Sequence, residues 1–297
     1  MGTVADKLAY LNDTKTAIKE ALIEKGVDVK ETDSFRSYAN KITNIEGGSN
    51  QKFGITLESI LGKNENGVLQ APTDSTTIDF TGVVEIGRQA LRKSFNGFPP
   101  SFTTALFPTT KIIRAEGLAY AFSGSTFETF DVSAIETIDA SGMYWTFHNI
   151  PIKTCNLQNL KTVGDAGLRD CFYQCTQLTS VLLPNLETVG LNGLYWMFEA
   201  CTSLPTMTFD KLVNIGSEGL GYAFDGCTNL KSVYFPALKS TSFGVYTNQF
   251  THMLQGVTGC TVHFPSNLQA VIGQWADVLN GFNGTNTTIL FDLEATE

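Results

Sequence analysis

Three histidines, His148, His252 and His263, are the side chains best suited to acid-base chemistry at neutral pH. A histidine acts as a general base only where a nucleophile and an orienting group converge on it in a cleft. His263 lies in the run TVHFP, which predicts a strand, so we expect it to face solvent or to satisfy a local hydrogen bond. The Gly-rich segment 219–226 lacks the lysine of a phosphate-binding loop. We therefore expect no catalytic residue and no cofactor, and we interpret the protein as a non-enzyme.

The six cysteines could in principle bind zinc or form disulfides. Cys171 and Cys175 are separated by three residues rather than two, and no second pair has a matching spacing, so we expect no metal site. Cys175, Cys201 and Cys227 instead recur every 26 residues, which favours small buried side chains at equivalent positions of a repeat. Free thiols of this kind fit synthesis in a reducing cytoplasm.

Charge and hydropathy disfavour two classes of partner. Over 297 residues the chain has 20 Lys and Arg against 29 Asp and Glu, a formal charge of −9 at pH 7, which argues against nucleic acid. Its most apolar windows are interrupted by Gly, Thr or charged residues well before the roughly 18 residues that a membrane span requires. The first 20 residues lack a basic start followed by an apolar run, so we expect neither a secretory leader nor membrane insertion.

One sequence pattern recurs along most of the chain, and the structure that it forms must position the histidines and cysteines. Each copy runs from an aliphatic residue, through a small residue and then leucine or methionine, to a phenylalanine nine positions after the start. The copies are Ile86–Phe95, Ile113–Phe122, Ile138–Phe147, Val163–Phe172, Val189–Phe198 and Ile215–Phe224, with a weaker seventh at Phe250. Successive phenylalanines lie 27, 25, 25, 26, 26 and 26 residues apart, which indicates one structural unit per coil.

Each unit is expected to contain a short helix and a strand. Leu and Phe four residues apart, as in GLGYAFDGC (219–227), share one face of a short helix, so the recurring phenylalanines should point into the core. After the cysteine, apolar residues at offsets 0, +3 and +5, such as Leu178, Val181 and Leu183, predict the inward side of a strand. Such coils bury their apolar side only by stacking, with the strands in one continuous parallel sheet. The expected fold is an α/β solenoid of about seven units.

The solenoid, 83–260, needs a cap at each end, because an end coil would otherwise present apolar surface and an open strand edge. Two β-like runs around Asn66-Gly67 predict a β-hairpin as the N-terminal cap, 53–82. The C-terminal cap, 261–297, is expected to contain in order a strand, a helix and a last strand: 261–264, 266–279 and 287–293.

The first 46 residues differ in kind from the repeats. Apolar residues there follow the 4,3 spacing of a heptad, which predicts an α-helix whose apolar stripe requires a partner. Gly26 ends this helix, and Asp33 or Ser34 begins a second one. We expect the two helices to form a hairpin, or several copies of the chain to bundle, and 47–52 to be a flexible linker to the solenoid. The candidate oligomerisation residues of this 1–46 segment are Val4, Leu8, Leu11, Ile18 and Leu22.

The expected strands also define a candidate binding face. Outward positions at offsets +2 and +4 form two parallel rows on the sheet, a surface that solenoids commonly use for recognition. Their Ser, Thr and Tyr side chains suit a polar ligand such as a glycan or a protein, and they equally suit solvated strand residues of good β propensity. The candidate residues are Thr129, Asp131, Asn156, Leu182, Thr208 and Tyr234.

The units AFDGCTNLKSVYFP and CFYQCTQLTSVLLP resemble the BspA-like leucine-rich repeats, over about residues 83–265. In that pattern an aliphatic-Gly pair precedes Ala-Phe, a Cys and a strand of the form Leu-x-x-Ile/Val-x-hydrophobic-Pro. Here the aliphatic residue lies nine residues before Phe rather than about five, so each helix should be nearly one turn longer. The resemblance implies a repeat solenoid, and many BspA-like proteins are cell-surface adhesins.

Both ends of the chain resemble bacteriophage proteins. The stretch LAYLNDTKTAIKEALIEKGVDVKETDSFRSYANKI is similar to the helical segment that opens many tail and fibre proteins of phages infecting gut Bacteroidetes and Firmicutes. The end, GCTVHFPSNLQAVIGQWADVLNGFNGTNTTILFDL, is similar to the terminus of phage-encoded repeat proteins of the same group. This resemblance implies a virion protein that is assembled in the host cytoplasm and released by lysis.

Two hypotheses follow. In the first, the helices of 1–46 anchor or oligomerise the chain on a phage particle, with a homotrimer favoured. The solenoid then projects as a fibre or adsorption component and binds a host surface glycan or protein, or another virion protein. In the second, the protein is a bacterial BspA-like cell-surface adhesin or interaction scaffold. Gene neighbourhood separates them, since the first predicts capsid, portal or tail genes nearby.

Overall fold

The computed structural model describes residues 62–63, 69–70, 76–96, 101–243 and 248–294. The chain divides into two units, Met1–Gly54 and Ile55–Glu297, and every described residue belongs to the second. The helices predicted over 1–46, their candidate oligomerisation residues and the linker therefore lie outside the described residues. Within the described ranges, no helix combines the length and apolarity that a membrane crossing requires.

Two short strands precede the solenoid. β1 (Gly62–Lys63) pairs antiparallel with β2 (Leu69–Gln70), with Gly62 opposite Gln70. The pair brackets the Asn-Gly turn that the sequence predicts, although that turn itself lies outside the described residues. Its role as an N-terminal cap stays a prediction.

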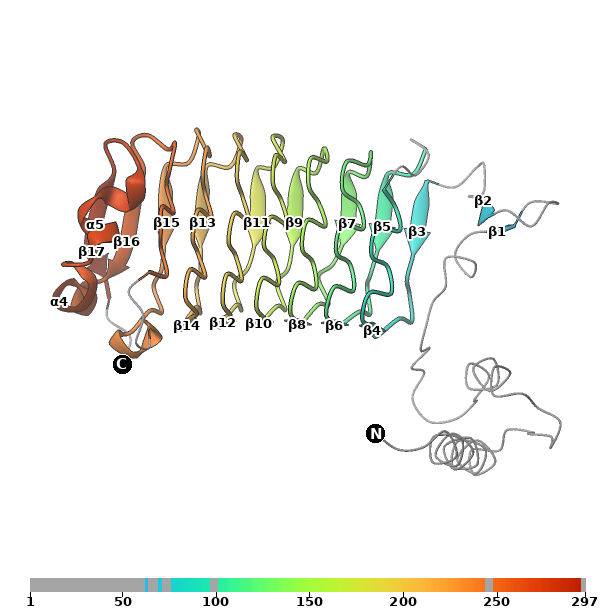
Figure 1. Cartoon of the computed structure of the whole chain (residues 1–297), viewed down its shortest axis with the longest axis horizontal. Coiled ribbons are helices and arrows are strands. Elements are labelled where there is room, and N and C mark those ends of the chain that lie inside the picture. Colours follow the sequence, from blue (N-terminus) through green and yellow to red (C-terminus); the bar gives the residue numbers. More distant parts are fainter. Residues whose placement is uncertain (1–61, 64–68, 71–75, 97–100, 244–247, 295–297) are drawn as a thin grey trace, which may run out of the picture. The chain divides into compact units, whose positions relative to one another are not determined.

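The remaining chain winds into a parallel β-solenoid of about eight turns rather than seven (Figure 1). One side carries the longer strands: β3 (Thr77–Asp79), β5 (Thr104–Leu106), β7 (Thr129–Asp131), β9 (Thr154–Asn156), β11 (Ser180–Leu182), β13 (Thr206–Thr208), β15 (Ser232–Tyr234), β16 (Thr261–Pro265) and β17 (Thr288–Leu293). The other side carries two-residue strands: β4 (Glu85–Ile86), β6 (Ile112–Ile113), β8 (Thr137–Ile138), β10 (Thr162–Val163), β12 (Thr188–Val189) and β14 (Asn214–Ile215). Each coil therefore contributes one strand to each side over most of the length.

The predicted single continuous sheet is wrong for the side with the longer strands. The short strands form one six-stranded sheet, β14-β12-β10-β8-β6-β4, whereas the long strands form three sheets, β3-β5-β7, β9-β11 and β13-β15-β16-β17. Between β11 and β13 the sheet is interrupted because a proline lacks the N–H that the other coils use. The N–H groups of Thr179 and Lys231 each donate to the preceding coil at 2.8 Å, but Pro205 holds that position between them and has no N–H.

The segments predicted as short helices are instead series of hydrogen-bonded turns, so the α/β solenoid is corrected to a β-solenoid. In the coil ending at Phe198, every second N–H donates to the carbonyl three residues earlier. The N–H groups between them donate to the next coil: Leu194 to Gly219 at 2.8 Å, and Phe198 to Ala223 at 2.9 Å. An α-helix uses its interior N–H groups within itself and could not make these bonds. The turns thus add a further hydrogen-bonded ladder between coils to those of the two strand sides.

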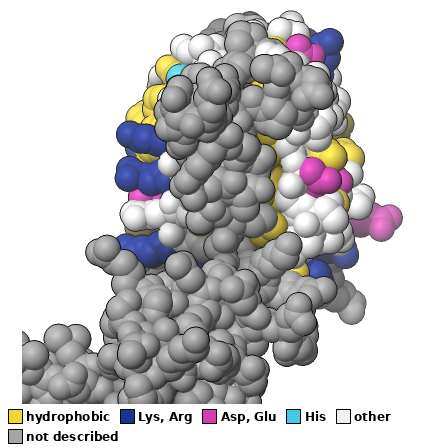
Figure 2. Space-filling view, turned by 90° about the vertical axis from the view of Figure 1, so that its right-hand side faces the viewer, with side chains coloured by type: hydrophobic (Ala, Val, Ile, Leu, Met, Phe, Trp, Pro, Cys, Tyr) yellow, Lys and Arg dark blue, Asp and Glu magenta, His cyan; other side chains and the backbone are white. Residues whose placement is uncertain are grey.

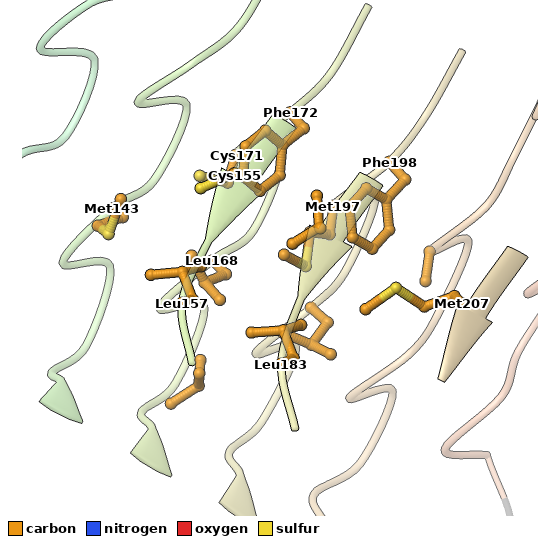
Figure 3. Close-up of a cluster of buried hydrophobic side chains, with 14 of the residues drawn as sticks. Met143, Cys155, Leu157, Leu168, Cys171, Phe172, Leu183, Met197, Phe198 and Met207 are labelled. Carbon is orange, nitrogen blue, oxygen red and sulfur yellow. The ribbon is translucent and has the colours of Figure 1, made fainter. Parts of the chain in front are cut away.

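A column of phenylalanines runs through the interior, as the sequence predicts. All of its rings are fully buried, and successive ring centroids lie 4.7, 6.2, 5.3, 5.7 and 5.4 Å apart. Figure 3 shows Phe172 and Phe198 in equivalent places of adjacent coils, among buried leucine, methionine and cysteine side chains. The column consists of Phe95, Phe122, Phe147, Phe172, Phe198 and Phe224.

Phe250 does not continue this column, contrary to the prediction. The N–H of Phe224 donates to the carbonyl of Met253 at 3.0 Å, which places Leu254 next in the column. Phe250 aligns instead with Leu220, whose N–H donates to the carbonyl just before it at 2.9 Å. That coil is therefore four residues longer than its neighbours. The 3₁₀ turn η1 (Ser240–Phe243) lies within it.

The C-terminal region continues the sheet and contains the helices. β16 pairs in parallel with both β15 and β17. In place of one helix near 266–279, the chain forms four short pieces: η2 (Ser266–Leu268), α4 (Gln269–Ile272), α5 (Ala276–Leu279) and η3 (Gly281–Asn283). Trp275, with φ −68° and ψ 142°, is extended and separates α4 from α5.

Close approach between coils makes glycine necessary at one repeated position. A Cβ on Gly216 would lie 2.6 Å from the carbonyl carbon of Gly190 and 2.7 Å from the nitrogen of Leu191. At the equivalent Gly87, near the other end, the nearest atom to such a Cβ is 4.0 Å away.

Gly216→Ala is expected to lower the free energy of unfolding by about 1–3 kcal/mol, because two backbones must separate to admit the methyl group. Gly87→Ala should change it by less than about 1 kcal/mol and need not destabilise. Chemical denaturation followed by circular dichroism measures both variants. Equal effects at the two positions would contradict the assigned stacking register.

Candidate functional site

The outward rows of the sheet lie where the sequence predicts them, but two of the candidate side chains are committed to local turns. Asp131 Oδ1 accepts hydrogen bonds from the N–H and hydroxyl of Ser133, at 3.2 and 2.7 Å. Asn156 Oδ1 accepts from the N–H of Gln158 at 3.0 Å. These side chains hold the turn that follows each strand, which is a structural role for Asp and Asn.

Leu182 and Thr208 lie together at the gap between β11 and β13. Half of the surface of Leu182 is exposed, and both residues line a shallow cavity of about 310 Å³ together with Asp210. Thr129, also predicted for this face, is exposed on β7. The sheet thus presents separate small features rather than one uninterrupted row.

Tyr234 lies at the C-terminal end of this face and contacts a histidine. Its ring stacks on His263 with centroids 4.3 Å apart and planes within 10°, and His263 Nδ1 lies 3.0 Å from Asp292. The other histidines pair elsewhere: His148 with the Ser123 hydroxyl at 3.0 Å, and His252 with the Tyr222 hydroxyl at 2.6 Å. In the part of the chain that the structure describes, no three His, Cys, Asp or Glu residues are arranged to hold a metal ion.

The buried cysteines serve the repeat, as their spacing predicts. All six are buried and unbridged. The thiol of Cys175 donates to the carbonyl of Phe147 at 2.8 Å, and Cys201 and Cys227 make the same bond to the preceding coil at 3.0 Å. Burial raises the pKa of the Cys175 thiol to about 12, so these thiols are poor nucleophiles.

The turn segments present a second outward surface, which sequence reasoning missed. Several positions of each turn segment have a left-handed backbone, and one of them recurs from Tyr120 to His252 with φ between 51° and 58°. From Tyr120 to Tyr222 its N–H donates to the carbonyl just before the same position in the next coil. Most residues at this position are aromatic and half-buried. We call this row the aromatic ridge: Tyr120, Trp145, Asp170, Trp196, Tyr222 and His252.

Further aromatic side chains of the same turns pack against the ridge. Tyr173 lies 5.5 Å from Trp145, and Tyr195 lies 5.5 Å from Tyr222, between ring centroids. The guanidinium of Arg169 lies over two of these rings, 5.1 Å from Tyr195 and 5.4 Å from Trp196. The ridge is therefore a band of contacting rings that crosses several coils.

Carboxylates interrupt the band. Asp170 has only 3% of its surface exposed, and its Oδ2 lies 3.2 Å from Arg169 Nε. Burial raises the pKa of Asp170 to about 6, although the Trp145 indole N–H and Arg169 act to lower it. Burial, followed by the charges of Asp225 and Asp170, raises the pKa of Glu199 to about 7. The ridge therefore carries partly desolvated acids.

A sequence signal for the ridge exists. Two positions before the column phenylalanines from Phe122 to Phe224, the repeats have Tyr, Trp, Asp, Trp and Tyr in succession, whereas Lys93 holds this place before Phe95. If the segment were a helix, this position would lie on the side of the helix and would have no special relation to the next coil. In the turns, backbone hydrogen bonds place it beside the same position of the next coil.

Polar and charged side chains also cover the flanks of the solenoid. Figure 2 looks along it from the β3 end, where several Lys and Arg side chains show at the left of the view, below hydrophobic side chains. Arg114 bridges Glu85 at 2.9 Å and Asp139 at 3.4 Å, which lie in the two neighbouring coils. Such exposed pairs contribute little to stability.

Comparison with known families decides the classification. Six copies of the BspA type leucine rich repeat region match this sequence, over residues 101–217 and 146–271. The chain belongs to the BspA-type leucine-rich repeat family. Its solenoid is thus a BspA-type repeat array. A comparison with curated proteins finds no match.

Solved structures of leucine-rich repeat proteins share 14% identity with the chain. The T. pallidum leucine-rich repeat protein has a TM-score of 0.33, covering 77% of this chain and 95% of its own. A leucine-rich repeat protein from Bacteroides ovatus has a TM-score of 0.32, covering 75% and 71%. The pneumococcal vaccine antigen PcpA has a TM-score of 0.26, covering 79% and 82%. With TM-scores this low, the classification rests on the repeat family alone.

The acids of the ridge predict how stability depends on pH. Because the pKa of Asp170 rises from 3.8 to about 6 on folding, the native state binds more protons than the unfolded state between these values. The free energy of unfolding should therefore fall as pH rises from 4 to 7, by at most about 3 kcal/mol from this residue. Asp170→Asn should flatten that dependence.

Urea denaturation at a series of pH values measures this effect. Asp210→Asn, which removes an exposed carboxylate on the sheet side, is the matched control and should keep the slope of the wild type. If Asp170→Asn and Asp210→Asn gave the same pH dependence, Asp170 would not be desolvated in the folded protein.

Proposed function

We propose that this BspA-type protein is a non-catalytic attachment protein, carried as a fibre or adsorption component on a bacteriophage particle. Its solenoid binds a host surface glycan or protein, or another virion protein. The observation that carries the binding role is an array whose neighbouring coils place outward side chains at equivalent positions, so that weak contacts can add up along its length. The resemblance of both chain ends to phage proteins supports the virion role.

The placement of the titratable groups supports a binding rather than a catalytic role. The side-chain hydrogen bonds of His148, His252 and His263 each go to one residue of an adjacent coil, in three separate places. The described cysteine thiols are buried. Catalysis would require such groups to converge on one cleft.

Fractionation of the source culture tests the virion role. Particles are induced, separated from cells on a density gradient and analysed by mass spectrometry. We expect peptides of this chain in the particle fraction together with capsid and tail proteins. Recovery from the cell envelope alone would contradict the virion role and would favour the second hypothesis, a bacterial BspA-like adhesin or interaction scaffold.

The mass of the full-length chain tests the proposed oligomer. Light scattering after size-exclusion chromatography should give three times the chain mass of 32.3 kDa if the heptad segment forms a trimer. Leu11→Asp combined with Ile18→Asp should reduce this to one chain. A monomeric wild type would remove the oligomerising role of 1–46.

A further inference from the structure

The middle of the aromatic ridge combines ring faces with carboxylates. Trp196 and Tyr222 come from successive coils, with centroids 5.5 Å apart. Glu199 follows Trp196 by three residues in the same turn segment, and Asp225 holds the equivalent place after Tyr222. All four side chains are half-buried, so each has a surface that a ligand can reach.

Glu199 has a charge environment that calls for a cation. Burial is the main cause of its raised pKa, and the two charged groups that add to the shift, Asp225 and Asp170, are both acids. Within the described ranges, no side chain donates a hydrogen bond to the Glu199 carboxylate or forms an ion pair with it. Asp225 accepts one hydrogen bond, from Gln255 at 3.0 Å, and Asp170 contacts Arg169. Three neighbouring coils thus supply three acids, and one arginine lies beside them.

The ridge already binds cationic side chains of its own chain. Arg169 lies over Tyr195 and Trp196, and its guanidinium is also 6.0 Å from Tyr144 in the preceding coil. Lys93 Nζ lies 5.3 Å from the centroid of Tyr120, near the start of the ridge. Cations over aromatic faces gain electrostatic energy from the rings. The same chemistry is therefore open to a cation from outside.

We propose that the aromatic ridge binds a basic peptide segment, with an arginine or lysine side chain held between the Trp196–Tyr222 rings and the Glu199 carboxylate. This inference deepens the proposed function by naming the chemistry of the partner. Backbone hydrogen bonds link the ridge positions of consecutive coils, and an extended chain presents alternate side chains on one side. Charge-assisted hydrogen bonds to Glu199 and Asp225 then add to the contacts with the rings.

A cation on a peptide fits this surface better than a metal ion does. The described residues provide no cluster of three His, Cys, Asp or Glu groups with metal-binding geometry. A neutral glycan would stack on the rings but would leave the mutual repulsion of the acids unrelieved. A guanidinium suits both the rings and the acids, since it is planar, stacks on aromatic rings and pairs with carboxylates.

Intrinsic fluorescence measures the binding directly. Two of the three tryptophans, Trp145 and Trp196, lie on the ridge, so full-length Trp275→Phe protein reports on this surface. The probe is the peptide Gly-Arg-Gly-Arg-Gly-Arg-Gly with blocked ends. The comparison peptide has citrulline, a neutral analogue of the same shape, in place of each arginine. Cellohexaose tests the glycan alternative.

We expect saturable binding of the arginine peptide and at least tenfold weaker binding of the citrulline peptide. Glu199→Gln should weaken the binding of the arginine peptide about tenfold, which corresponds to about 1.4 kcal/mol of binding free energy. The matched control is Glu187→Gln, an exposed acid of the same coil that borders the short-strand side. It should change the affinity less than twofold.

Three results would overturn the inference: no binding of the arginine peptide, equal binding of the citrulline peptide, or equal weakening by Glu199→Gln and Glu187→Gln. Binding of cellohexaose in place of the arginine peptide would identify a glycan surface instead. These outcomes are independent of the proposed virion role, because the particle fractionation does not depend on which ligand the ridge binds.

Discussion

Stacking of one buried phenylalanine on the next, coil after coil, is the interaction on which the solenoid depends. A single coil has two or three residues per strand and cannot enclose an apolar interior. When coils stack, the rings from Phe95 to Phe224 form a continuous column with no exposed surface. Each coil contacts mainly its two neighbours, so stability is a sum of nearly equal interfaces rather than the property of one central core. The thiols of Cys175, Cys201 and Cys227 belong to the same arrangement, because each donates to a carbonyl of the preceding coil.

The stacking also determines what the outer surface can do. Backbone ladders on both strand sides and along the turns hold each coil in register, so a side chain that points outward in one coil has a counterpart in the next. Aromatic residues at one left-handed position become the aromatic ridge, and acids at the same or nearby positions become neighbours across coils. Attachment through many similar contacts suits such a surface, whereas chemistry that needs several different groups in one cleft does not.

Much of this could be predicted from the sequence, because spacing alone carries the information. A period of 25 to 27 residues fixes the coil, and the inward offsets of the strands follow from alternation, as at Leu178, Val181 and Leu183. The turns could not be told from helices, since Leu and Phe four residues apart share a side in both. The break in the sheet at Pro205 could not be predicted, because it requires knowing that the N–H at this position donates to the preceding coil in the other repeats. Phe250 keeps the 26-residue spacing by coincidence, because the coil lengthens before it. The aromatic ridge could not be predicted either, because it depends on the turns that the sequence does not distinguish from helices.

A double-mutant cycle on adjacent rings tests the stacked column most directly. Phe172→Leu and Phe198→Leu, whose ring centroids lie 5.7 Å apart with planes within 8°, should show a coupling in unfolding free energy of about 0.5–1.5 kcal/mol. The pair Phe122→Leu and Phe224→Leu, separated by three further rings of the column, should be additive within about 0.5 kcal/mol. Additive effects for the adjacent pair, or equal coupling for both pairs, would contradict the account.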